Sequence, residues 1–476
     1  MNQILSKVKS NMTVQYTPHP NPQLRGNPLV EVLGFPLTSK QFIHQCTKAP
    51  DVSLNLSDIP LEHQGYYQRS GIDNLSGGYV VQDEAPRLYD AMRRMIESGY
   101  IYRNPLTFGD FKTIALTEDT EPNRTQQLAL QQTAYQSSFL LAGLSGRGKT
   151  AMTESILSTI PQIITHRNYK DQTFTYEQVV WLKVDVPTMK GQRALLWRIL
   201  DALDTVTGEQ YYSSHTKSNV TTLMMAVRKA LVLHGVGIII LDEAQNLSKA
   251  AQTDKVGNNE NATLRFIEEL FNKVGVPLLL VGTLTTLSLF SQEMTAARRI
   301  GKSGSLILEQ CDVDSSFWKR FIEQMCPVQL LSNQHTDLDT LTRHIHHLSA
   351  GIPAIASNLI RSTMSYLTYL TPENQDLSMK ALDKIFSEQF SVISAALRAL
   401  KQGKFYQFED CAPLTLLHES EDYFRAETFE KANSIKPEQK PTYNKGAGQK
   451  KLNDKHLQML DNMSPESLLK RANNSE

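Results

Sequence analysis

The sequence lacks a long hydrophobic run, because no eighteen consecutive apolar residues occur among its 476 residues. Residues 1–7 also lack the apolar segment of a secretory signal. Both absences argue against a membrane-spanning helix or an exported chain. We therefore expect a cytoplasmic protein that makes no contact with a membrane.

Cysteine is scarce as well. The chain has four, Cys46, Cys311, Cys326 and Cys411, and none is spaced as a metal-ligand pair. This pattern gives no zinc site and suits a reducing compartment.

An excess of charge of either sign is also missing, because 49 basic residues balance 49 acidic ones. A uniformly basic, nucleic-acid-coating chain is therefore excluded. Any binding to nucleic acid has to come from local patches that oligomerisation multiplies.

A phosphate-binding loop is present at residues 143–150, directly after the apolar run 138–142. Closely spaced glycines let backbone N–H groups surround phosphates, Lys149 reaches the β and γ oxygens, and the Thr150 hydroxyl ligates Mg²⁺. The expected cofactors are ATP and Mg²⁺. The residues expected to contact the nucleotide are Gly143, Ser145, Gly146, Arg147, Gly148, Lys149, Thr150 and Ala151.

A pair of carboxylates follows a second apolar run. Residues 236–241 are typical of a buried parallel strand and end in Asp242 and Glu243. At the carboxyl end of such a strand Asp242 holds Mg²⁺ and Glu243 polarises the attacking water, which predicts hydrolysis. The alternative is a solvated acidic strand end.

Two further candidates follow in chain order. Thr283 comes after the apolar run 277–281, where its hydroxyl can orient the nucleophilic water; the alternative is an ordinary turn or helix cap. Arg298 or Arg299 can reach a neighbouring subunit's γ-phosphate, or can belong to a solvated basic helix end. The sequence does not say which arginine points inward.

Four regions are predicted along the chain: an N-terminal extension with a partner-binding role at 1–135, an α/β nucleotide-binding domain at 136–330, a helical lid at 331–401 and a polar, lysine-rich tail at 402–476. Strands and helices alternate in the second region, which predicts a parallel sheet. Its expected strands are near Phe139, 179–186, 236–241, 278–281 and Val328. Its expected helices are near 150–159, 193–203, 221–233 and 264–274, after one near 85–99 in the N-terminal region.

The lid is predicted from helical patterns at 338–348 and 355–367, which Gly351 and Pro353 separate. His344 and His347 share a helix face, but without cysteine or carboxylate partners we expect surface residues and not a metal site. The tail is read as a flexible segment in which the amphipathic stretch 452–460 either docks on a partner or is simply solvated.

Several stretches resemble TnsC, the AAA+ target-selection regulator of multi-protein cut-and-paste transposons, which is related to TniB and MuB. The resemblance covers roughly residues 60–365. It is carried by residues 99–105, 177–185, 241–247, 274–283 and 297–301. The segment with Arg103, Asn104 and Pro105 and the run into Thr283 are its more specific parts.

The resemblance implies an AAA+ sandwich with a helical lid that forms an ATP-dependent hexameric or heptameric ring, or a filament, on duplex DNA in the bacterial cytoplasm. A target selector of the TnsD or TniQ kind would recruit it, and it would license the TnsA/TnsB transposase. Arg298 or Arg299 would read the neighbour's nucleotide, and hydrolysis at Glu243 would disassemble the oligomer.

DNA contacts in such rings come from loops that face the central channel. The matching stretch here holds Lys183, Thr188, Lys190 and Arg193, of which Lys190 is the first candidate. The alternative is a solvated loop with scattered cations. One departure from the pattern concerns the lid: Pro353 stands where AAA+ lids often have a sensing arginine, and Arg361 comes later, which puts nucleotide sensing by the lid in doubt.

Two other functions stay open at this point. An AAA+ loader or initiator of DNA replication predicts a dedicated helix-turn-helix reader after the lid, and none is recognised in 402–476. A nucleotide-gated scaffold that does not bind DNA predicts long repeats after the lid, for which the chain leaves little room.

Overall fold

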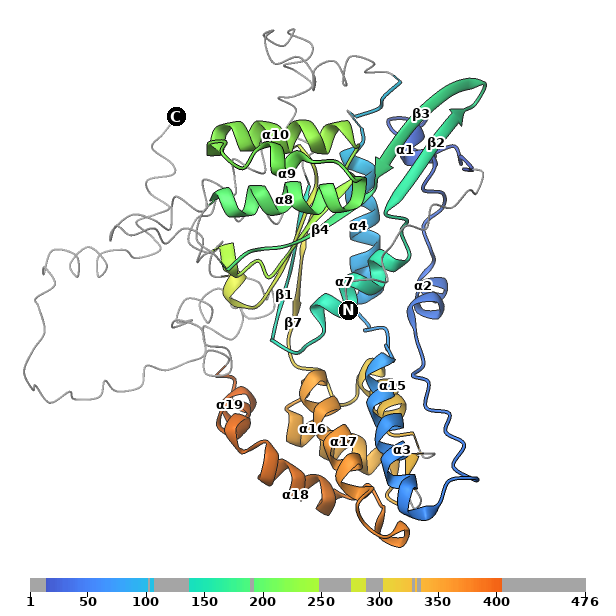
Figure 1. The fold of residues 1–476 in the computed structure, drawn as a ribbon, viewed down its shortest axis with the longest axis vertical. Helices are drawn as coiled ribbons and strands as arrows, with labels where there is room; N and C mark the ends of the chain where they lie inside the picture. The colour runs from blue at the N-terminus through green and yellow to red at the C-terminus, as the bar shows by residue number, and fades with distance from the viewer. Residues whose placement is uncertain are drawn as a thin grey trace, which may run out of the picture. The chain divides into compact units, whose positions relative to one another are not determined.

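The structure is a computed structural model, and it describes residues 14–101, 103–106, 137–188, 192–247, 275–287, 303–327, 330–331 and 335–404. All structural statements below concern these residues. Their arrangement is shown in Figure 1.

The centre of the fold is a five-stranded sheet in the order β4-β5-β6-β1-β7, in which every neighbouring pair is parallel. This confirms the predicted parallel α/β architecture. The strands are β1 (Ser138–Gly143), β4 (Trp181–Asp185), β5 (Ile238–Asp242), β6 (Leu278–Gly282) and β7 (Ser305–Leu308).

The edge strand β7 was not predicted. It has only four residues, and its apolar run, residues 306–308, is shorter than the runs that mark β1, β5 and β6. The strand expected near Val328 and the helix expected at 264–274 lie outside the described residues.

Helices cover both faces of the sheet (Figure 1). On one face lie α8 (Gln192–Thr207) and α10 (Val220–Leu233), with the short α9 (Tyr211–Ser214) beside them, and they share a buried core with β4 and β5. On the other face lie α4 (Ala85–Gly99) and α7 (Lys149–Ser158). The predicted helices near 85–99, 150–159, 193–203 and 221–233 are confirmed.

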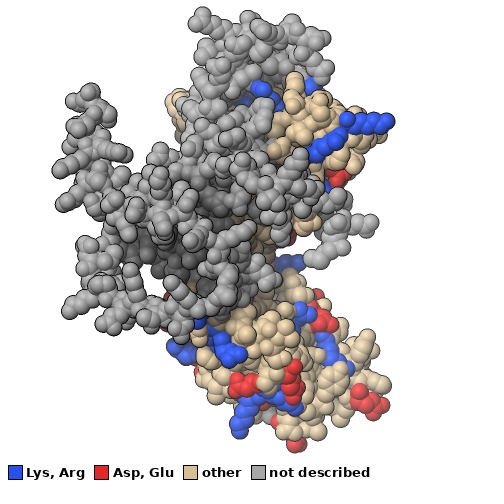
Figure 2. Space-filling model, turned by 90° about the vertical axis from the view of Figure 1, so that its left-hand side faces the viewer, with Lys and Arg blue, Asp and Glu red and all other residues tan. Residues whose placement is uncertain are grey.

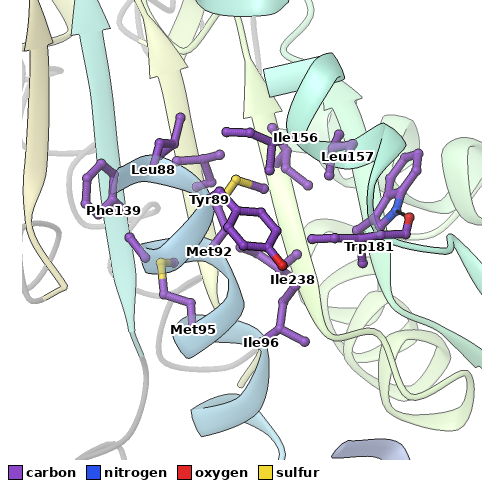
Figure 3. Packing of buried hydrophobic residues seen from close by; sticks show 14 of the residues in the cluster. Leu88, Tyr89, Met92, Met95, Ile96, Phe139, Ile156, Leu157, Trp181 and Ile238 are labelled. Carbon is purple, nitrogen blue, oxygen red and sulfur yellow. Dashed lines mark hydrogen bonds between the residues drawn. The ribbon is translucent and has the colours of Figure 1, made fainter. Parts of the chain in front are cut away.

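The N-terminal region is part of the core. Four α4 residues at helical spacing, Leu88, Met92, Met95 and Ile96, are at most 2 % exposed and pack on the sheet, as Figure 3 shows. Burying such a side chain contributes about 1.5–3 kcal/mol. The short helices α1 (Pro28–Glu31) and α2 (Ser39–Cys46) join the same cluster. The described N-terminal residues and the sheet therefore share one buried core.

Arg103, from the stretch that carries the resemblance, joins the end of α4 to the strand that bears the carboxylates. Its Nε donates to the Gly99 carbonyl and its Nη1 donates to the Val236 carbonyl, both at 2.6 Å. The guanidinium lies 4.8 Å from the Tyr100 ring centroid. Arg103 thus fastens the N-terminal region just ahead of β5.

An antiparallel hairpin of β2 (Ile163–Tyr169) and β3 (Gln172–Val179) was also missed by the sequence reading. It stands beside the main sheet and turns at Lys170, which has a positive φ of 53°. The buried polar side chains of the hairpin have hydrogen-bond partners. His166 bonds to Tyr16 and Gln178, and Gln178 donates to the Tyr100 hydroxyl at 2.9 Å. The predicted strand at 179–186 is in fact the end of β3 followed by β4.

The lid is a helical unit with its own buried core. The helices predicted at 338–348 and 355–367 are confirmed as α16 (Leu338–Ser349) and α17 (Pro353–Leu367). The others are α3 (Leu61–Asn74) with η1 (Leu75–Gly77), α15 (Ser316–Met325), η4 (Pro372–Asn374), α18 (Met379–Gln389) and α19 (Ser391–Lys401). Because α3 comes from the N-terminal region, that region contributes to both cores.

Within the described part of the chain, no helix is both long enough and apolar enough to cross a bilayer.

Candidate nucleotide site

The loop between β1 and α7 has the backbone geometry that phosphate binding needs. Gly146 and Gly148 have positive φ angles of 78° and 91°, which side-chain-bearing residues rarely adopt. Gly148 then caps α7, whose first N–H groups have no partners within the helix and point out of its N-terminus. Thr150 and Ala151 are exposed in this first turn. The predicted loop therefore presents an anion-binding helix end.

Lys149 lies inside the loop. Its ammonium donates to the carbonyls of Gly143, at 2.8 Å, and Leu144, at 3.0 Å. Both carbonyls belong to the turn that leaves β1, so the charge is held beside the backbone that would surround the phosphates. This position agrees with the predicted role of Lys149.

The side chain of Arg147, a residue predicted to contact the nucleotide, is buried and bonded within the protein. It is 3 % exposed, and its guanidinium donates to Gln82 at 2.8 Å, to Glu84 at 3.1 Å and to the Glu309 carbonyl at 2.9 Å. Gln82 in turn donates to the Arg147 carbonyl at 3.1 Å. Through these bonds the Arg147 side chain holds the loop in place. Contact between Arg147 and a nucleotide stays a prediction.

The same segment also reaches the lid. Asp83, between Gln82 and Glu84, accepts from the Phe317 N–H at 3.0 Å and from Arg320 at 3.0 Å. Phe317 lies in the first turn of α15, so the Asp83 carboxylate caps that helix. Residues 82–84, which we call the clasp, therefore connect the phosphate-binding loop to the first helix of the lid.

The ends of β5 and β6 complete the site. Strand β6 lies between β5 and β1, so Asp242, Glu243 and Thr283 all follow strands at the same carboxyl edge as the loop. Asp242 is 4 % exposed, whereas Glu243 is exposed. The structure thus places the loop, the carboxylate pair and Thr283 at one edge of the sheet.

Lys183, expected as a DNA contact, lies beside the carboxylates. Its ammonium is 2.8 Å from a Glu154 carboxylate oxygen and 3.2 Å from Asp242 Oδ2. Burial lowers the pKa of Lys183, but the hydrogen bond to Glu154 and the charges of Asp242 and Glu154 outweigh burial, so the pKa is raised. The lysine is a charged neighbour of the expected magnesium ligand.

Gln245 was given no role by the sequence reading. Its side chain bridges Glu243, after β5, and Thr283, after β6. Its Nε2 donates to the Glu243 carboxylate, and its Oε1 accepts from the Thr283 N–H at 3.1 Å. The only signal in the sequence was its place two residues after Glu243. Its position against β6 depends on tertiary structure.

The remaining predicted residues are placed as follows. Thr188 and Arg193 are exposed on either side of residues 189–191, and Arg193 donates to the Ser218 carbonyl at 2.7 Å. Lys190, Arg298 and Arg299 lie outside the described residues. DNA contact and the trans-acting arginine therefore stay predictions.

The lid touches the loop through the start of α17. The Ala354 N–H donates to the Gly146 carbonyl at 3.1 Å, and a Cβ built on Gly146 would lie 3.1 Å from Ile352. Arg361 instead pairs with Asp73 at the end of α3, at 3.2 Å. The lid thus meets the loop by backbone and apolar contact, and Arg361 is engaged elsewhere.

No metal cluster is found among the described histidines, cysteines and carboxylates. His344 bonds to Asp383 at 2.8 Å and His346 to the Cys311 carbonyl at 2.7 Å. Burial raises the pKa of both the Cys311 and Cys326 thiols to about 12.

Comparison with known protein families gives a match to the central part of the chain. A family model described as an AAA domain matches residues 132–290, which include the loop, the carboxylate pair and Thr283. No curated protein matches the chain. AAA domains of this kind are P-loop nucleotide-binding modules, and the parallel sheet and loop geometry described above are those of this class. The chain therefore contains an AAA domain, which spans residues 132–290.

Proposed function

We propose that this chain is an ATP-driven regulator of DNA transposition that oligomerises on duplex DNA. The observation that carries the proposal is the convergence of the AAA domain with the stretches that resemble TnsC, above all residues 99–105 and 274–283. The first stretch contains the buried Arg103, and the second leads into the sensor Thr283.

The chemistry is ATP hydrolysis. Lys149 and the N-terminus of α7 bind the phosphates, and Thr150 and Asp242 would hold Mg²⁺, which neutralises charge on the phosphate oxygens. Glu243 orients and polarises the attacking water from the neighbouring strand, with Thr283 beside it. Hydrolysis ends the life of the assembly, so the nucleotide acts as a timer.

DNA contact comes from the loop that follows β4, through Thr188, Lys190 and Arg193. On the face shown in Figure 2, acidic and basic side chains of the described residues lie interspersed over its lower part. Such a mixed surface offers no concentrated positive charge for DNA phosphates. A loop with basic residues that is repeated in each subunit supplies that charge. Contacts with phosphates carry no base code, which suits a protein that accepts the site its partner selects.

The oligomer is a hexameric or heptameric ring, or a filament, in which Arg298 or Arg299 reaches the neighbouring nucleotide. Its partners are a TnsD- or TniQ-like selector and a TnsA/TnsB-like transposase. Support for these partners comes from the resemblance alone.

The test is electron microscopy of the purified chain with duplex DNA in ATP, a slowly hydrolysed analogue or ADP. We expect DNA-threaded oligomers only with the triphosphates. Absence of DNA-bound oligomers in every nucleotide state would contradict the proposal and would move the assignment toward an AAA+ loader or a nucleotide-gated scaffold.

A further inference from the structure

We propose that Gln245 is a positioning residue for ATP hydrolysis, which holds the Glu243 carboxylate and ties it to the backbone of the sensor strand. This inference deepens the proposed function, because it rests on hydrolysis at Glu243. It starts from one side chain that bonds to both elements at once.

The backbone at Glu243 makes this arrangement possible. Glu243 has a positive φ of 57°, a left-handed conformation that costs a residue with a side chain about 1–2 kcal/mol. The Asp242 carboxylate accepts from the Glu243 N–H at 2.9 Å and supports the turn. The chain therefore bends sharply where β5 ends.

The bend directs the next residues toward β6. The Ala244 N–H donates to the Val281 carbonyl at 2.8 Å, which places the following residue over the end of that strand. Gln245 then reaches the Thr283 N–H with its carbonyl oxygen and keeps its amide nitrogen for Glu243. A carboxamide can make both bonds at once, because its nitrogen donates and its oxygen accepts.

The contact with β6 is close. A Cβ built on Gly282 would lie 2.9 Å from Gln245 Oε1, so the carboxamide rests on the backbone of the strand end. Gln245 is only partly exposed, whereas Glu243 is exposed. An exposed carboxylate has many rotamers, and a donor fixed to the scaffold restricts them.

A consequence is that movement at the end of β6 reaches Glu243. Thr283 is the residue expected to orient the nucleophilic water, and its backbone N–H donates to the Gln245 carboxamide. A shift of that backbone changes the position of the carboxylate that polarises water. Gln245 thus couples the sensor to the base.

The experiment compares Gln245→Met with the wild-type full chain. Methionine keeps the length and removes both hydrogen bonds, so we expect kcat to fall about tenfold or more while the affinity for a fluorescent ATP analogue changes less than about twofold. The matched control is Gln162→Met. Gln162 is also half-buried, and its side chain donates to the carbonyl of Trp181, the first residue of β4, at the sheet edge opposite to the candidate site. This control should leave kcat unchanged.

A double-mutant cycle separates positioning from a general structural effect. If Gln245 acts through Glu243, Gln245→Met should have no further effect on the residual rate of Glu243→Gln. A similar loss in both backgrounds would overturn the proposal. Should Gln245→Met fail to fold, as judged by thermal unfolding, Gln245→Glu keeps the acceptor for Thr283 but places like charge beside Glu243, and kcat should again fall.

The outcomes also separate this proposal from the proposed function. Wild-type turnover with an unaffected Gln245→Met variant would overturn only the role of Gln245. A Gln245-dependent ATPase that forms no oligomers on DNA would leave the positioning role standing and contradict the transposition role. A wild-type chain without turnover would overturn both.

Discussion

The two halves of the nucleotide site are held by contacts of different range. Arg147 in the phosphate-binding loop bonds to residues 63, 65 and 162 positions away. At the strand ends, Asp242, Glu243 and Gln245 support one another locally, and their distant contacts come from the neighbouring strands: Gln245 reaches the Thr283 N–H, 38 positions away, and Asp242 faces Lys183. The loop thus depends on the N-terminal region, whereas the strand ends depend on two adjacent strands.

This difference also separates two tasks. Under the proposed function, the loop half, with its cations and N–H groups, binds the phosphates, and the strand-end half, with its carboxylates, carries out hydrolysis. Substitutions that remove one task and leave the other are the most direct way to sharpen the comparison.

The largest effect is expected at Lys149. Lys149→Ala removes the ammonium that lies inside the loop, on the carbonyls of Gly143 and Leu144, where we expect the phosphates to bind. A lost charge-assisted contact of about 3 kcal/mol weakens nucleotide affinity roughly 100-fold. Titration with a fluorescent ATP analogue measures this, with exposed Lys40→Ala as the control. Ordinary affinity in Lys149→Ala would contradict the site assignment.

Glu243→Gln should impair hydrolysis and leave nucleotide binding nearly unchanged. The amide keeps the size of the side chain but loses the charge that polarises water, so kcat should fall about 10²- to 10³-fold while nucleotide affinity stays within a few fold. A coupled phosphate-release assay gives kcat, with exposed Glu177→Gln as control. Oligomers of this variant on DNA should persist longer than those of the wild type, and rapid dissociation in ATP would count against the timer.

Arg147→Met tests the long-range support of the loop. The substitution leaves Gln82 and the Glu309 carbonyl without their donor, which should destabilise the fold by about 2 kcal/mol and loosen nucleotide binding. The matched control is Arg94→Met, whose exposed pair with Asp90 contributes only about 0.5 kcal/mol. Thermal unfolding compares the two; equal losses would show that the clasp does not support the loop.

Lys183→Met tests whether that lysine belongs to the nucleotide site or to DNA. Its ammonium neutralises Asp242, so its removal should lower the Mg²⁺ concentration for half-maximal ATPase a few fold. The salt dependence of DNA binding should stay as in the wild type, whereas Lys190→Ala should reduce its slope by about one. A reduced slope in Lys183→Met would instead place Lys183 in the DNA path.

The smallest effect is expected at His166, remote from both halves. Burial lowers its pKa, so the unfolded chain binds more protons here than the folded one between the two pKa values. The stability that the neutral imidazole contributes is present above the ordinary histidine pKa and is lost as pH falls through the lowered one. His166→Gln should therefore flatten the loss of thermal stability on acidification, and exposed His63→Gln should leave it unchanged.

The local sequence was sufficient for the site's main residues. Continuous apolar runs ending in Gly143, Asp242 and Gly282 predicted three buried parallel strands, and such strands end at a common edge. Glycine spacing predicted the loop because only glycine adopts positive φ without strain. The lid helices were equally readable from their periodicity.

Some features escaped because their signal is weak or not local. The apolar run of β7 is only three residues long, and the hairpin strands are largely polar. Arg147 and Lys183 looked like ligand contacts because a cation in a loop or at a strand end gives no sign of its partner.

The sequence by itself determined the parallel sheet, the phosphate-binding loop, the carboxylate pair and the helical lid, since each follows from residue type and spacing within a short segment. Only the tertiary structure decided that Arg147 supports the loop, that Lys183 faces Asp242 and that Gln245 joins Glu243 to Thr283. Those roles depend on which distant carbonyl or carboxylate lies within about 3 Å, and hydrogen-bond reach is a property of the folded chain.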